Sequence, residues 1–192
     1  MIEVEIRGPV AKKEYDKMKK TLEETGENIL REKRAVILFT GEHAHAFSDI
    51  EISSGKKSKM ILRDHKNKSE TVLSLESNQF SKGVEFCVKL GYTKGIVSIR
   101  DFFCASYGGA YFSLVDPLEN DSLYYEAVIM ANDPTSAKEA KKKLEALARK
   151  FKLPVWGSLE MTSFFEKLNK QTNYVYDYNV HGAHHFKDKF GI

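Results

Sequence analysis

The sequence predicts an α+β fold built on an antiparallel sheet of about eight strands. Several segments alternate apolar and polar residues with a period of two, which is typical of strands. Most connections between these segments are short and rich in turn residues, which favours antiparallel pairing over crossover helices. Three amphipathic segments supply the helices. An antiparallel sheet of this size is expected to curl, so we predict a β tunnel or barrel with flanking helices.

Composition places the chain among globular proteins. It has 192 residues, of which 42% are hydrophobic and 30% charged, and a formal net charge of +3. A chain of this length can bury roughly 70% of its unfolded surface, so a full core is expected without disulfides or metal. Charges of both signs are interspersed, which argues against a duplex nucleic-acid binder, whereas a small anionic ligand stays open.

The N-terminal residues indicate the compartment. Residues 1–7 alternate acidic and aliphatic side chains and therefore lack the features of a secretory signal. The nearby apolar run 35–39 is far shorter than the roughly 20 residues of a membrane span. Cys87 and Cys104 are not in a CxxC spacing. Their neighbours are apolar, as is common for cysteines in a protein core. We expect a cytoplasmic protein with no membrane partner.

The expected strands follow from the alternation and from two more apolar stretches. In 2–7 the even positions are aliphatic and the odd positions are Glu3, Glu5 and Arg7. The complete set of expected strands is 2–7, 34–40, 49–53, 59–63, 71–76, 96–100, 111–115 and 124–129.

Helices are expected at 11–24, at 80–88 and after Asp133. The third has the clearest boundaries, since Asp133 can cap it, Pro134 suits its first turn, and Ser136 and Glu139 have the spacing of a capping box. Residues 1–170 are expected to form one domain. Residues 171–192 are expected to form a C-terminal strand or lid, or a mobile tail, in which a histidine cluster has no nearby cysteine to complete a zinc site.

Charged side chains share one face of several expected strands. They alternate with aliphatic residues, so packing of the aliphatic faces under the helices would turn the charged faces inward. Buried charges must be paired or must bind something. Carboxylates are ligands for Mg²⁺ or Mn²⁺ and arginines fork onto phosphate oxygens, so the mixture suits a metal-chelated polyphosphate.

The motifs on these strands resemble those of the CYTH superfamily, the triphosphate tunnel metalloenzymes. Glu3-Val4-Glu5-Ile6-Arg7 is similar to the family's ExExK signature, and 60–63 to its LTxK segment. Segment 114–118 through 124–128 keeps the Asp-to-Glu spacing of its LDxVxxLGxFxExE pattern, and 163–168 resembles SYxELL of the cyclase-like branch. The resemblance spans residues 1 to about 168.

The resemblance implies an eight-stranded tunnel in which glutamates bind one or two divalent ions and basic residues bind a triphosphate. Its implied metal ligands, for Mg²⁺ or Mn²⁺, are Glu3, Glu5 and Glu126. The implied phosphate contacts are Arg7, Arg63 and Arg100. Lys59, on the same face as Arg63, is expected to join them, and Glu76 and Arg100 are the expected catalytic groups. Asp116 is expected near the site.

Departures from the family pattern leave the activity open. No arginine follows Asp49 at the positions where the family has two. Ser98 and Val72 stand where the family has basic residues, and Val128 stands where the family has its last glutamate. A triphosphate carries about four negative charges, and each lost charge-assisted hydrogen bond costs about 1.5 to 3 kcal/mol. Lys59 compensates in part. The expectation is therefore a metal-dependent triphosphatase, or else a class IV adenylyl cyclase; the alternative is a non-catalytic phosphate- or nucleotide-binding module.

Overall fold

The computed structural model describes residues 1–40, 44–51, 58–64, 70–76, 79–118, 122–170, 174–182 and 184–190. These residues confirm the α+β class, with a mostly antiparallel sheet and several helices. The strand order is β1-β8-β7-β6-β2-β3-β4-β5, and β9 pairs with β6 off this path. In the part of the chain that is described, no pairing closes the sheet into a barrel.

The chain divides into two compact units. Unit 1 consists of Met1–Arg31 and Asp101–Gln171, and unit 2 of Glu32–Arg100 and Thr172–Ile192. Two strands contribute to both units, namely β2 (Glu27–Thr40) and β6 (Lys94–Tyr107).

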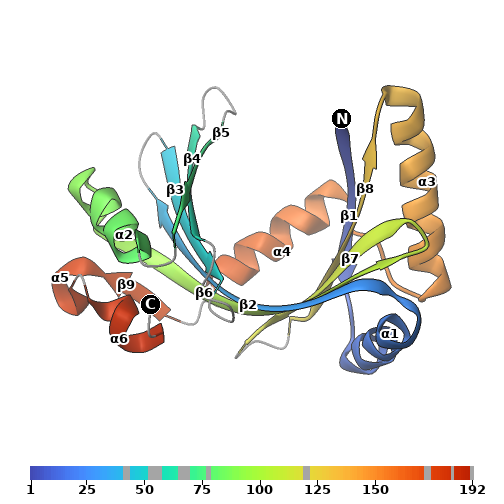
Figure 1. The fold of residues 1–192 in the computed structure, drawn as a ribbon, viewed down its shortest axis with the longest axis horizontal. Helices are drawn as coiled ribbons and strands as arrows, with labels where there is room; N and C mark the ends of the chain where they lie inside the picture. Colours follow the sequence, from blue (N-terminus) through green and yellow to red (C-terminus); the bar gives the residue numbers. More distant parts are fainter. Residues whose placement is uncertain are drawn as a thin grey trace. The chain divides into compact units, whose positions relative to one another are not determined.

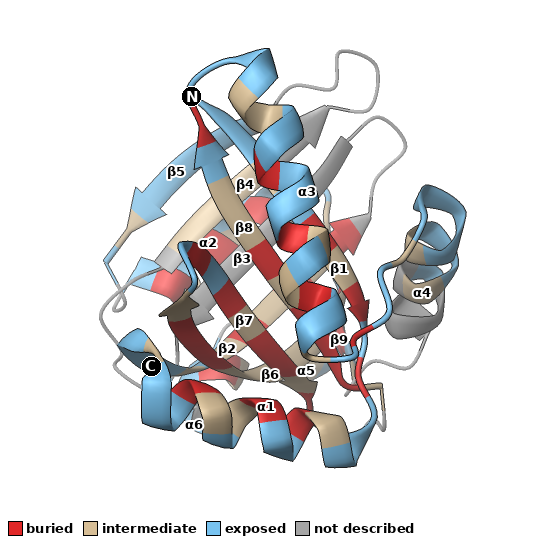
Figure 2. Cartoon of the chain, turned by 90° about the vertical axis from the view of Figure 1, so that its right-hand side faces the viewer, coloured by how far each residue is buried: buried red, intermediate tan, exposed pale blue. Residues whose placement is uncertain are grey.

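Unit 1 has strands β1 (Ile2–Pro9), β7 (Ala110–Pro117) and β8 (Tyr124–Ala131), which pair in the order β1-β8-β7. Its helices are α1 (Lys12–Thr25), α3 (Pro134–Lys150) and α4 (Ser158–Lys170). Figure 1 shows α3 running beside β1 and β8. The buried sides of α1 and α3 face the strands in Figure 2, and together they form the core of this unit.

The ends of α3 follow from local chemistry. The Asp133 carboxylate accepts hydrogen bonds from the backbone N–H groups of Thr135 and Ser136, at 2.8 and 2.9 Å. The Ser136 hydroxyl in turn accepts from the Asp133 N–H at 3.1 Å. The capping box therefore joins Asp133 to Ser136, and not Ser136 to Glu139 as the sequence spacing suggested.

Unit 2 has strands β3 (Ala44–Glu51), β4 (Ser58–Asp64) and β5 (Glu70–Leu75), followed by α2 (Phe80–Lys89). Its C-terminal part is β9 (Tyr174–Asp177), α5 (Tyr178–His181) and α6 (His185–Phe190). The core combines Ile37 and Phe39 of β2, Phe80 and Val84 of α2, and Tyr176 and Phe186 of the C-terminal part, among others. Strand β9 lies in the segment for which a C-terminal strand or lid, or a mobile tail, is expected.

Several elements differ from the expectation. Strands β2 and β6 each have 14 residues, which is twice the expected length for β2 and almost three times the expected length for β6. Helices α4, α5 and α6 were not expected. None of the described helices combines the length and apolar character that crossing a bilayer requires.

Candidate functional site

The two faces of β1 have different environments. Ile6 is 4% exposed and belongs to the core under α3, and Val4 packs against that core. Because side chains alternate along a strand, Glu3, Glu5 and Arg7 lie on the opposite face. The β1–β8 register places Glu5 opposite Val128 and Arg7 opposite Glu126, so that face continues onto β8.

Three charged side chains meet on this face, and we name them the Arg7 cluster: Glu5, Arg7 and Glu126. The Arg7 Nε atom lies 2.6 Å from Glu5 Oε1 and 3.3 Å from Glu126 Oε1. The side chains are 22–27% exposed, so all three are partly accessible to solvent, and Glu5 as a whole residue is exposed. One guanidinium therefore bridges two carboxylates on neighbouring strands.

The carboxylates decide the ionisation of Arg7. Burial alone would lower the Arg7 pKa, but the charge of Glu126 and the hydrogen bond and charge of Glu5 outweigh burial and raise the pKa from its ordinary value. Arg7 is thus a permanent cation in this cluster.

The face keeps a net negative charge after this pairing. Glu3 lies two residues before Glu5 on the same face of β1. It is opposite Met130 and is exposed. Three carboxylates and one guanidinium give −3 + 1 = −2. Carboxylate oxygens suit a hard divalent cation, and Mg²⁺ commonly takes one or two carboxylates while keeping waters and phosphate oxygens as its other ligands. Glu5 and Glu126 fit that donor set, although the described residues hold no group of three metal-ligating side chains.

The other predicted site residues belong to unit 2. Lys59 on β4 is half-buried and lies opposite Ser74 of β5. The backbone places Arg63 on β4, and its side chain lies outside the described part of the chain. The Arg100 Nε atom on β6 donates a hydrogen bond to Ser98 Oγ at 3.0 Å. Glu76 is exposed just after β5, and its N–H donates a hydrogen bond to Gln79 Oε1 at 3.2 Å.

Asp116 lies away from the Arg7 cluster, contrary to the expectation. Its neighbour Val115 and also Ser113 share the face of Glu126, whereas Asp116 follows Leu114 on the core face of β7. There the charges of Lys12 and Lys19 on α1 and of Asp101 act on it. Burial and Asp101 raise the Asp116 pKa, against the two lysines.

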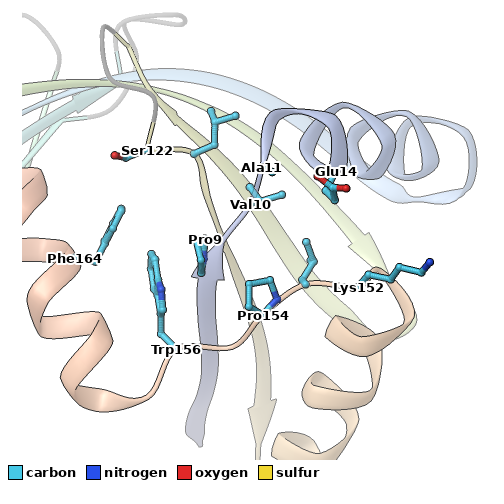
Figure 3. A pocket seen from close by; sticks show the side chains of 11 residues that line it. Pro9, Val10, Ala11, Glu14, Ser122, Lys152, Pro154, Trp156 and Phe164 are labelled. Carbon is cyan, nitrogen blue, oxygen red and sulfur yellow. The ribbon is translucent and has the colours of Figure 1, made fainter.

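A pocket of about 610 Å³ adjoins the face that carries the Arg7 cluster (Figure 3). This pocket was not predicted from the sequence. Its lining comes from three segments: Pro9, Val10, Ala11 and Glu14; Ser122 and Leu123; and Lys152, Leu153, Pro154, Trp156 and Phe164. In Figure 3 the rings of Trp156 and Phe164 stand side by side on one wall. Their centroids are 4.3 Å apart, with an interplanar angle of 34°.

The chain before α4 is fixed along β1. The Trp156 N–H donates to the Arg7 carbonyl at 2.8 Å, and the Tyr125 hydroxyl donates to the Pro154 carbonyl at 2.9 Å. A Cβ atom at Gly8 would overlap the Pro154 carbonyl, so this close approach requires glycine. These contacts hold Trp156 beside the Arg7 cluster.

Comparison of the whole chain with known proteins identifies the fold. No family model matches, and no curated protein matches either. A solved structure named as a candidate adenylate cyclase from Vibrio parahaemolyticus is similar, with a TM-score of 0.59 and 14% identity over 85% of this chain and 98% of that one. A candidate adenylyl cyclase from Hippeastrum, described as having a dominant triphosphatase activity, has a TM-score of 0.54 and 11% identity over 86% and 95% of the two chains.

The same fold occurs in another setting. A chain of the Schizosaccharomyces pombe Mediator head module is similar with a TM-score of 0.59 and 12% identity, over 81% of this chain and 98% of that one. The fold is therefore one that adenylate cyclase-like proteins have, and at these identities the likeness is one of fold alone.

Proposed function

We propose that the protein binds a triphosphate on the charged face of its sheet and hydrolyses a phosphoanhydride bond with the help of Mg²⁺ or Mn²⁺. The observation that carries the proposal is the Arg7 cluster, in which two carboxylates lie within ion-pair distance of one guanidinium on neighbouring strands. The fold supports it, because proteins named for adenylate cyclase and triphosphatase activity have a similar one.

Electrostatics make the binding depend on a cation. A face with a net charge of −2 repels a triphosphate unless a cation lies between them. In the proposal Glu5 and Glu126, with Glu3 beside them, bind the divalent ion, which supplies positive charge at the phosphoryl oxygens. Arg7 then exchanges its carboxylate partners for phosphate oxygens, because its forked guanidinium suits either anion.

Unit 2 contributes the remaining groups of the proposal. Lys59, Arg63 and Arg100 bind phosphate oxygens and neutralise the charge that develops during bond breaking. Glu76 orients the attacking water. The CYTH-like motifs imply these roles for the four residues.

A binding module without turnover is the second candidate. It is favoured by the hydrophobic Val128 opposite Glu5 and by the Ser98 hydroxyl at an expected basic position beside Arg100. The Mediator head module shows that a similar fold also occurs in an assembly.

Turnover assays separate the two candidates. Phosphate release and cyclic nucleotide formation are measured with ATP, thiamine triphosphate and tripolyphosphate, each with Mg²⁺, with Mn²⁺ and with EDTA. The hydrolase proposal predicts metal-dependent phosphate release that Glu126→Gln abolishes. Metal-dependent binding of these compounds without phosphate release or cyclisation would establish the binding module.

A further inference from the structure

The pocket beside the Arg7 cluster has the chemistry of a ring-binding site. Trp156 and Phe164 form its aromatic wall, and both are partly exposed. Glu14 and Lys152 also line it and offer a hydrogen-bond acceptor and donor for the polar edge of a ring. Its volume of about 610 Å³ lies in the range of pockets that bind small organic molecules.

The aromatic wall is supported from beneath. Tyr124 is fully buried, and its ring centroid lies 5.2 Å from that of Phe164 and 6.4 Å from that of Trp156. The hydrogen bond from Trp156 to Arg7 fixes the backbone at the same point. A wall held in this way loses little side-chain entropy when a ligand stacks on it.

The pocket and the Arg7 cluster share one face of the same two strands. Pro9, which lines the pocket, pairs with Tyr124, and the next pair on this face is Arg7 with Glu126. Two residues along a strand correspond to about 6.7 Å, which a phosphate chain joined to a sugar or a short linker easily spans.

We infer that this pocket binds a planar heteroaromatic ring of the nucleobase kind, and that Trp156 and Phe164 thereby select a triphosphate with an organic part over inorganic tripolyphosphate. The selection of a triphosphate rests on the function proposed above, whereas ring binding itself rests on the pocket alone. Stacking is tolerant of ring identity because every such ring has a π face.

The chain has a built-in reporter for this pocket, since Trp156 is its single tryptophan. The emission of Trp156 is followed while adenosine, which has no phosphate, or ATP with Mn²⁺ is added. Binding of tripolyphosphate with Mn²⁺ is followed in parallel by the melting temperature. The inference predicts that millimolar adenosine quenches the emission and that ATP does so at lower concentration.

A variant tests the wall itself. Phe164→Leu should weaken adenosine and ATP binding by about 5- to 150-fold, the usual worth of one stacked base, and leave tripolyphosphate binding unchanged. Phe86→Leu is the matched control, because Phe86 on α2 is 56% exposed and lies outside the pocket.

The outcomes distinguish the inference from the proposed function. Quenching by adenosine, with ATP and Mn²⁺ no more effective than adenosine and no effect of tripolyphosphate, would keep the ring pocket and remove the triphosphate function. A melting shift with tripolyphosphate, but no quenching of the wild-type protein by adenosine or ATP, would overturn the ring pocket. The second result needs no variant, so it holds even where Phe164→Leu fails to fold.

Discussion

Arg7 reduces the repulsion between the carboxylates on the charged face of unit 1. Its guanidinium lies between Glu5 and Glu126 and cancels part of the repulsion between them. In the proposed function, a divalent ion bound by the two carboxylates would perform the same task, so the ion and Arg7 would be alternative partners of Glu5 and Glu126. Under that proposal, the exchange would allow a face with an excess of carboxylates to attract an anionic substrate once metal is present.

Val128→Glu tests whether the face around Glu5 and Glu126 binds metal. Residue 128 lies opposite Glu5 and two positions from Glu126, so the new carboxylate joins two others. The variant should melt below wild type in EDTA, because like charges repel, and should recover in millimolar Mn²⁺. Val128→Gln adds no charge, so its melting temperature should differ from that of wild type by the same amount in EDTA and in Mn²⁺. Equal destabilisation of Val128→Glu with and without Mn²⁺ would contradict a metal site here.

Asp116→Asn probes the acidic side chain between β7 and α1. The Asp116 pKa is raised in the folded protein, so the folded state binds the proton more tightly than the unfolded state. The stability of the wild type therefore falls as the pH rises past 3.8 and through the folded pKa. Asp116→Asn should raise the melting temperature at neutral pH and give little gain below about pH 3. A variant less stable than wild type at neutral pH would show that Lys12 and Lys19 stabilise the ionised form.

At the scale of elements, the C-terminal part of unit 2 is packed through an aromatic and histidine cluster. The His185 Nε2 atom lies 3.0 Å from the Tyr174 hydroxyl, and the rings of His181 and His185 are 4.6 Å apart. Tyr176 and Phe186 are fully buried beside them. Helices α5 and α6 thus anchor the chain after β9, in the segment where the sequence predicts a strand or lid, or a mobile tail.

Acidification should weaken this anchoring. Burial, the His181 charge and Lys189 lower the His185 pKa below 6.5, against Asp188. The folded state favours neutral His185. The stability that neutral His185 contributes is therefore present above pH 6.5 and is lost as the pH falls from there through the folded pKa. Between about pH 7.5 and pH 5.5 the melting temperature of wild type should drop more than that of His185→Gln. Equal drops would show that other groups set the acid response.

Strand positions could be predicted from the sequence where alternation is regular, as in β1 and β8. The lengths of β2 and β6 could not, because their alternation breaks, as at Asp101-Phe102-Phe103 in β6. Helix α4 did leave a signal, since Met161, Phe164 and Leu168 recur at helical spacing. The Glu5, Arg7 and Glu126 group was predictable because it lies on two alternating strands. The pocket was not, because three distant segments form it.

At the scale of the whole molecule, the predicted functional groups are divided between the two units. The Arg7 cluster belongs to unit 1. The phosphate-binding candidates Lys59, Arg63 and Arg100 belong to unit 2. Binding to either set should stabilise the native state, because the unfolded chain does not hold the groups of that set together.

The most direct test of the account is the melting temperature with tripolyphosphate, with and without Mn²⁺. At a ligand concentration of about 100 Kd, native-state binding contributes about 2.7 kcal/mol, which for a chain of this size raises the melting temperature by roughly 5 to 10 °C. The account predicts this rise for wild type with Mn²⁺, its absence in EDTA, and its loss in Glu126→Gln and Arg7→Ala. The same rise in EDTA and in both variants, or none with Mn²⁺, would contradict metal-dependent triphosphate binding at the Arg7 cluster.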